Sequence, residues 1–146
     1  MAYTAFTRAG FRTFRDNNRG GPVHMLNLIK LRPLADYGDE PPHNGGPVTG
    51  AEAYAAYGRE SAPVLARLGA RIVWRGRLEQ VLIGPDDEAW DVCFIAEYPS
   101  SAGFADMVFD PQYRTAMRHR QAAVADSRLI RLNPLAHGTT FNDPED

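Results

Sequence analysis

The sequence has little of what marks several large classes of protein. Its one cysteine, Cys93, excludes an intramolecular disulfide and any metal site built from several cysteines. No stretch reaches the roughly 20 apolar residues that a membrane-spanning helix needs. Lys and Arg total 16 against 18 Asp and Glu, which gives a net charge of -2 without a basic run. We therefore expect neither a nucleic acid nor a membrane as partner.

Recognition motifs for common cofactors are absent too. There is no Gly-rich phosphate loop and no nucleophile elbow, and the four histidines are dispersed without the paired spacing of a metal site. We expect no metal and no cofactor, with a single-histidine haem site as the alternative left open. The N-terminus has polar or charged residues every few positions, unlike a signal peptide, so we expect a cytoplasmic protein.

What is present suits one globular domain. The 146 residues are 44% hydrophobic, enough for a core without disulfide or metal support. We expect a single domain over 1–146, with a helix and linker over 1–21, a folded core over 22–133 and a polar tail over 134–146. The Pro- and Gly-rich segment 33–50 predicts a long loop of a length that is often functional.

Hydrophobic periodicity and capping residues predict an α+β fold. After a helix within 4–17, the order is strand, helix, strand, strand, helices, strand. This order is the ferredoxin-like split β-α-β arrangement, a four-stranded antiparallel sheet with helices on one face. The predicted strands are 23–31, a strand or hairpin over 70–83, 90–98 and 127–132, and the main helices are 49–68 and 110–125.

Both faces of the predicted sheet carry apolar residues. In the first strand Met25 and Ile29 alternate with Leu26 and Leu28, and the third strand shows the same pattern. A monomer with helices on one face would expose the other as a large apolar patch. We therefore expect a homodimer in which two sheets pack face to face.

Four phrases carry a resemblance to a known family: MLNLIKLRP, VTGAEAYAAY, WDVCFIAEYPS and DPQYRTAMRHR. In this order and spacing, over roughly 20–133, they resemble the family called domain of unknown function 1330. The resemblance implies the dimeric α+β barrel fold and a homodimer. The wider superfamily includes cofactor-free monooxygenases, lactone isomerases, haem proteins and members without known activity, so the resemblance implies no single reaction.

Arg120 is the most informative single residue. It shares a helical stripe with Tyr113 and Met117, and a lone charge on an apolar face is costly unless it is paired. Two interpretations remain open: a buried ion pair with Glu97 or Asp91, or an anchor for an anionic ligand. The resemblance aligns Arg120 with an arginine typical of the family's second helix, which does not separate them.

Two further polar residues are candidates. His119 is the candidate catalytic acid or base, and its alternative is a partly exposed helix histidine. Asn27 interrupts an apolar strand, so its amide must bond to backbone, to water or to a ligand carbonyl. The MLNLIKLRP phrase places it, by resemblance, on a strand that lines a cleft.

These residues suggest a small-molecule site. We expect Asn27, His119 and Arg120 to orient a ligand, with Trp74 and Met107 as apolar walls and Tyr113 as a further ligand contact. The leading hypothesis is a homodimeric small-molecule-binding protein with one pocket per protomer for an apolar, aromatic or anionic ligand. If it is an enzyme, cofactor-free chemistry of isomerase or monooxygenase type is favoured. The alternative is a non-catalytic metabolite-binding or self-association module.

Overall fold

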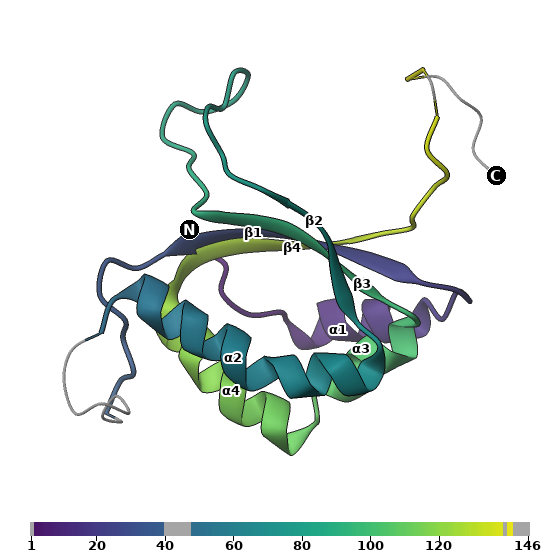
Figure 1. The fold of residues 1–146 in the computed structure, drawn as a ribbon, viewed down its shortest axis with the longest axis horizontal. Helices are drawn as coiled ribbons and strands as arrows, with labels where there is room; N and C mark the ends of the chain where they lie inside the picture. The colour runs from purple at the N-terminus through teal and green to yellow at the C-terminus, as the bar shows by residue number, and fades with distance from the viewer. Residues whose placement is uncertain (1, 40–47, 139, 142–146) are drawn as a thin grey trace.

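One antiparallel sheet covered by helices on a single face forms the centre of the molecule (Figure 1). The computed structural model describes residues 2–39, 48–138 and 140–141. The strands are β1 (Val23–Leu31), β2 (Arg71–Gly76), β3 (Val92–Tyr98) and β4 (Val124–Leu132). The helices are α1 (Arg8–Asp16), α2 (Gly50–Leu68), α3 (Ser101–Met107) and α4 (Pro111–Ala123).

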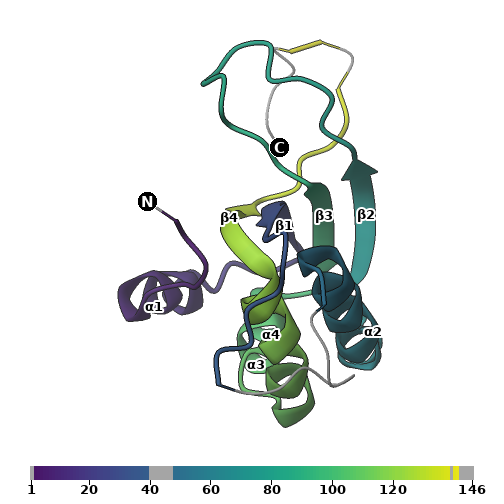
Figure 2. The same ribbon diagram turned by 90° about the vertical axis from the view of Figure 1, so that its left-hand side faces the viewer.

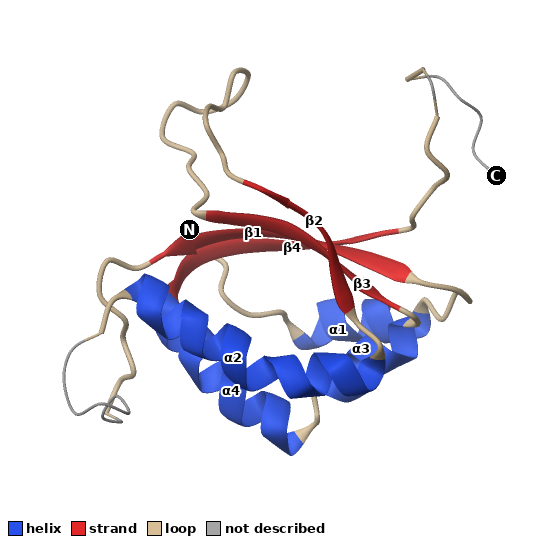
Figure 3. Ribbon diagram, viewed as in Figure 1, coloured by secondary structure: helices blue, strands red, loops and turns tan. Residues whose placement is uncertain are grey.

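The sheet order β2-β3-β1-β4 confirms the predicted ferredoxin-like arrangement. Helices α2 and α4 lie side by side under one face, whereas α1 and α3 lie together at one end (Figure 3). The long β2–β3 connection and the chain after β4 project on the other side of the sheet (Figure 2). Within the described residues, no helix is both long and apolar enough to cross a membrane.

Helix α2 shows how local signals set its ends. The Thr49 side chain accepts from the backbone N–H of Glu52, and the Glu52 carboxylate accepts from the backbone N–H of Thr49, which completes the expected capping box. Gly69 closes the helix at φ 72°, a left-handed conformation that glycine adopts without strain. The helix is continuous through Pro63.

Register decides which side chains face the helices. Val23, Met25, Asn27 and Ile29 of β1 are buried toward α2 and α4. Their neighbours on the strand point to the other face, because successive side chains alternate. That other face, which we call the open face, carries residues paired across the sheet: His24, Leu26, Leu28, Arg71, Trp74, Cys93, Ile95, Glu97, Arg128, Ile130 and Leu132.

The strand predicted over 70–83 is wrong in its second half. Only Arg71–Gly76 pairs, and it pairs with β3, whose first residue is Val92. Residues 77–91 form the connection between β2 and β3, which includes a turn where the N–H of Glu88 donates to the carbonyl of Pro85. Leu82 and Ile83 in this segment are exposed.

Candidate active site

His119 lies in α4 with 1% of its surface exposed, so the partly exposed alternative is wrong. Its Nε2 is 2.5 Å from a carboxylate oxygen of Glu60 in α2. Its Nδ1 is 2.7 Å from the hydroxyl oxygen of Tyr37, which follows β1. We call these three side chains the Glu60–His119–Tyr37 triad.

The partners of His119 assign its tautomer. A carboxylate only accepts hydrogen bonds, so Nε2 carries the proton and donates a hydrogen bond to Glu60. The other nitrogen, Nδ1, then accepts from the Tyr37 hydroxyl. The triad is therefore a continuous line of hydrogen bonds from a carboxylate through a buried imidazole to a phenol.

Backbone contacts hold Tyr37 in place. The N–H groups of Arg32 and Asp36 donate to the carbonyls of Ala123 and Ala122, both at 2.8 Å. These bonds tie the segment after β1 to the end of α4, beside His119. The predicted loop over 33–50 thus contributes a side chain to the site, although its residues 40–47 lie outside the described part of the chain.

The electrostatics keep Tyr37 protonated. Burial raises the pKa of its hydroxyl, and the nearby charge of Glu60 raises it further. The Arg118 guanidinium, 5.0 Å from the centre of the Tyr37 ring, acts in the opposite direction. Tyr37 and Glu60 are both half-buried, so the two ends of the triad reach the surface while His119 is enclosed.

Sequence reasoning missed Glu60 and Tyr37. A signal for Glu60 exists in α2, which contains two acidic residues. Glu52 belongs to the capping box, so Glu60 is the acidic residue left for another contact. It lies three residues after Tyr57, so the two are neighbours on the helix surface. Tyr37 has no such signal, because a loop has no periodicity to orient its side chains.

A group of buried tyrosines lies beneath the sheet. The hydroxyls of Tyr57 and Tyr113 are 2.8 Å apart, and the Tyr54 and Tyr57 rings are 5.5 Å apart. Burial raises the pKa values of Tyr54, Tyr57, Tyr98 and Tyr113, so all four remain neutral phenols.

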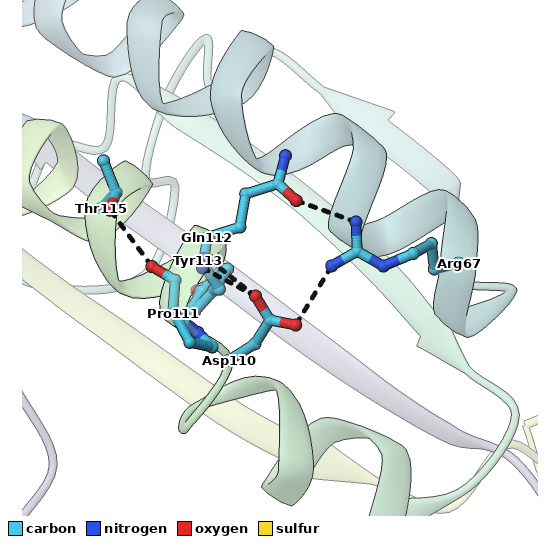
Figure 4. A network of polar contacts seen from close by, with 6 residues as sticks. All are labelled: Arg67, Asp110, Pro111, Gln112, Tyr113 and Thr115. Atoms are coloured by element: carbon cyan, nitrogen blue, oxygen red, sulfur yellow. Dashed lines mark hydrogen bonds and ion pairs between the residues drawn. The ribbon is translucent and has the colours of Figure 1, made fainter.

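The start of α4 is clamped to α2 (Figure 4). The Asp110 carboxylate accepts from the backbone N–H groups of Tyr113 and Gln112, and Arg67 of α2 donates to both Asp110 and Gln112. The N–H of Tyr113 is the main cause that lowers the pKa of Asp110, followed by Gln112 and Arg67. This clamp sets where Tyr113 enters the interior.

Arg120 does not form the predicted ion pair. Glu97 instead contacts His24 and Arg71 on the open face, and Asp91 accepts from the backbone N–H of Leu31. Arg120 is 9% exposed and donates from Nη1 to the carbonyl of Thr4 at 3.4 Å. Among the described residues, no carboxylate pairs with it.

The remaining residues that the sequence predicts for the site lie in different parts of the molecule. Met107 packs in the same core cluster as Tyr113, and Asn27 is buried with its amide donating to the carbonyl of Met25 at 3.0 Å. Trp74 is 49% exposed on the open face, so the sheet lies between it and the helix-covered interior. In the part of the chain that the structure describes, no three His, Cys, Asp or Glu residues group as metal ligands.

Comparison with known proteins identifies the family of this chain. The model described as "Domain of unknown function (DUF1330)" matches residues 46–132. The chain belongs to this family. The match begins after the MLNLIKLRP phrase, so the DUF1330 similarity is shorter at its N-terminal end than the 20–133 expected.

Solved structures are similar to this chain over most of its length. Two crystal structures of RPA0582, one methylated and one described as a protein of unknown function from Rhodopseudomonas palustris, are 57% and 58% identical to this chain. They cover 94% of it and 98% and 100% of their own chains, each with a TM-score of 0.87. A dimeric protein of unknown function with a ferredoxin-like fold from Bacteroides fragilis is 15% identical, covering 79% of this chain and 97% of its own with a TM-score of 0.45. Curated proteins provide no match to this DUF1330 chain.

Proposed function

We propose that this protein is a homodimeric, cofactor-free enzyme that transfers a proton to and from a small apolar or aromatic ligand, anionic ligands included. The observation that carries the proposal is the buried imidazole of His119, hydrogen-bonded at one nitrogen to Glu60 and at the other to the Tyr37 hydroxyl. A line of this kind, with a titratable imidazole between a carboxylate and a phenol, has the residue types and hydrogen-bond geometry of a general acid–base site.

The proposed step balances within the triad. The ligand gives a C–H or O–H proton to the Tyr37 oxygen while the Tyr37 proton moves to Nδ1 of His119. The imidazolium that results is stabilised by the Glu60 carboxylate. Because its raised pKa keeps Tyr37 protonated, Tyr37 serves as a conduit rather than as a free phenolate.

Two outcomes complete the reaction. Return of the proton to a different ligand atom is an isomerisation. Reaction of the deprotonated, electron-rich ligand with dioxygen is the monooxygenase type: one oxygen atom enters the ligand as a carbonyl, the ligand is oxidised and supplies the electrons, and the second oxygen atom leaves as water. Within the helix-covered interior we retain Asn27, Met107, Tyr113 and Arg120 as proposed ligand contacts, whereas we assign Trp74 to the subunit contact.

The open face supports the proposed homodimer. Trp74, Ile130 and Leu132 are 49%, 42% and 39% exposed on one continuous sheet surface. Soluble monomers rarely leave so large an apolar patch in water. A second copy of the same face would bury it around a twofold axis.

Phenylpyruvate in deuterated water tests the proton transfer, because it is aromatic and anionic and has an acidic C–H. We expect the protein to accelerate deuterium exchange, measured by NMR, and Tyr37→Phe and Glu60→Gln to reduce the acceleration by roughly 100-fold or more. Tyr3→Phe, which changes an exposed tyrosine outside the triad, serves as the control. Exchange that persists in Tyr37→Phe would overturn the proposal.

A non-catalytic metabolite-binding or self-association module is the second candidate. It is favoured by one observation: the triad also joins the segment after β1, α2 and α4, as a structural network would. In that case Tyr37→Phe lowers stability, ligand affinity is unchanged and no exchange is accelerated by the wild-type protein.

A further inference from the structure

The N-terminal segment 2–7, which we call the N-terminal strap, lies beside β4 at the edge of the sheet (Figure 2). It also contacts Arg120 of α4. The backbone N–H of Tyr3 donates to Asp126 at 2.9 Å, and the Ser127 hydroxyl donates to the carbonyl of Tyr3 at 2.7 Å. The next residue, Thr4, presents its carbonyl to the Arg120 guanidinium at 3.4 Å. The strap is thus well anchored on β4 and weakly bound to Arg120.

The Arg120 contact is poor for a buried charge. Hydrogen bonds of this type are usually about 2.7–3.2 Å long, and those to a charged partner are shorter still. A buried guanidinium needs an opposite charge to offset its lost hydration. Among the described residues no carboxylate supplies it, and Arg120 donates instead to the neutral Thr4 carbonyl.

The groups around Arg120 are neutral phenols, which supply O–H hydrogen-bond donors but no negative charge. Tyr113 lies about two helical turns before Arg120 on α4, and its hydroxyl is 2.8 Å from that of Tyr57 in α2. Burial raises the pKa values of Tyr54, Tyr57 and Tyr113, and the Arg120 charge acts against this effect. Tyr57 and Tyr113 share one hydrogen bond, which leaves one of their two O–H groups available. The Tyr54 ring lies 5.5 Å from the Tyr57 ring, so its phenol belongs to the same group.

One cation among neutral O–H donors is a recognition pattern for a monoanion. A planar guanidinium donates two parallel hydrogen bonds to a carboxylate, and phenols add single donors to its remaining lone pairs. A phosphate carries up to two charges at neutral pH, which a single arginine does not balance. The aromatic rings of Tyr54, Tyr57 and Tyr113 favour a flat apolar body attached to the anionic group.

We propose that Arg120, with Tyr54, Tyr57 and Tyr113, binds the carboxylate of a small aromatic acid, which displaces the Thr4 carbonyl and loosens the N-terminal strap. The inference rests on the proposed function for the existence of a ligand and adds the chemical class of its charged end. It also makes the strap a competitor: weaker attachment of residues 2–7 strengthens ligand binding.

Benzoate is the probe, benzamide is its uncharged equivalent, and inorganic phosphate is the competing anion. Binding is followed by calorimetry and by NMR of the arginine side-chain N–H signals. We expect benzoate to bind and shift the Arg120 signal, and benzamide to bind at least roughly tenfold more weakly. Equal binding of benzamide, tighter binding of phosphate or no binding of benzoate overturns the proposal.

Variants separate Arg120 from other arginines and the strap from the site. We expect Arg120→Met to weaken benzoate binding by roughly tenfold or more, while Arg114→Met on the exposed side of α4 leaves it unchanged. If Arg120→Met does not fold, Arg120→Lys, which keeps the charge and loses the planar fork, still has to weaken binding severalfold. Ser127→Ala removes one strap hydrogen bond and is expected to strengthen binding severalfold. Unchanged affinity in the Arg120 variants, or weaker binding in Ser127→Ala, contradicts the inference.

Failure of this inference is distinguishable from failure of the proposed function. Tyr37→Phe leaves Arg120 intact, so it keeps benzoate binding even where it loses proton exchange on phenylpyruvate. A protein that binds benzoate through Arg120 without catalysing exchange refutes the triad alone. Exchange that depends on Tyr37 but is indifferent to Arg120→Met refutes the carboxylate site alone.

Discussion

The two faces of the sheet are built from the same strands but have different chemistry. Toward the helices, β1 buries Val23, Met25 and Ile29 completely or nearly so, and the buried Asn27 amide donates to the carbonyl of Met25. On the open face, large apolar side chains such as Trp74 and Ile130 remain exposed around the ion pair of His24 with Glu97. One residue of register separates the two environments.

We assign a different proposed function to each face of the sheet. The helix-covered side brings α2, α4 and the segment after β1 together, so it contains the Glu60–His119–Tyr37 triad and Arg120. The open side has no helix to cover it, and we propose that it serves subunit association. The predictions below test this division, in order of decreasing effect.

Ile29→Ala should have the largest effect on folding. The side chain is fully buried between the sheet and the helices, so its truncation leaves a cavity that costs about 2–5 kcal/mol of unfolding free energy. Urea denaturation measures this loss. Ile83→Ala, at an exposed position of the β2–β3 connection, is the control and should change stability by no more than about 0.5 kcal/mol. Equal losses for both variants would contradict the core assignment.

Ile130→Glu should act on assembly instead. A carboxylate on each open face would meet its symmetry mate in the dimer, so we expect the dissociation constant to rise by roughly tenfold or more. Sedimentation velocity measures this shift. Ala55→Glu adds the same charge to an exposed position of α2 and should leave the dimer intact. Dimers that survive Ile130→Glu would place the interface elsewhere.

Tyr37→Phe should lower the free energy of unfolding without creating a cavity in the core. It removes the hydroxyl that donates to Nδ1 of the buried His119, and a buried acceptor without a partner costs about 1–3 kcal/mol. Thermal and urea unfolding measure the effect, with Tyr3→Phe as the exposed control. A Tyr37→Phe protein as stable as the wild type would mean that the triad contributes nothing to folding.

The contacts of Glu97 with His24 and Arg71 should have the smallest effect on stability, and this effect should depend on pH. Hydrogen bonds from His24 and then Arg71 lower the pKa of Glu97. Its contribution is therefore complete above the pKa of an unfolded glutamate and is lost as the pH falls through the lowered folded-state pKa. Glu97→Gln should cost about 0.2–1 kcal/mol at neutral pH and reduce the loss of stability in acid. An unaltered acid profile in urea titrations would contradict this assignment.

Local sequence signals predicted much of the fold. The limits of β1 agree with the predicted 23–31, because turn residues and a proline flank an apolar run. The ends of α2 follow from Thr49, Glu52 and Gly69, whose effects reach only a few residues along the chain. The strand predicted over 70–83 was too long, since its limit depends on where β3 begins.

The candidate site was predictable only in part. The stripe on α4 correctly indicated that Arg120 and Tyr113 are buried. It did not identify their partners: Glu97 faces the other side of the sheet, and the Thr4 carbonyl is 116 residues away in sequence. Glu60 reaches His119 only because α2 and α4 pack side by side.

The sequence by itself determined the α+β class, the helix caps and the side of each strand that is apolar, since these depend on periodicity and on neighbours within a few residues. Only the tertiary structure decided that Glu60, His119 and Tyr37 meet, that Arg120 lies under the N-terminal strap and that Trp74 lies apart from both. Such contacts join segments distant in the chain. Their geometry depends on packing and register, which no local pattern records.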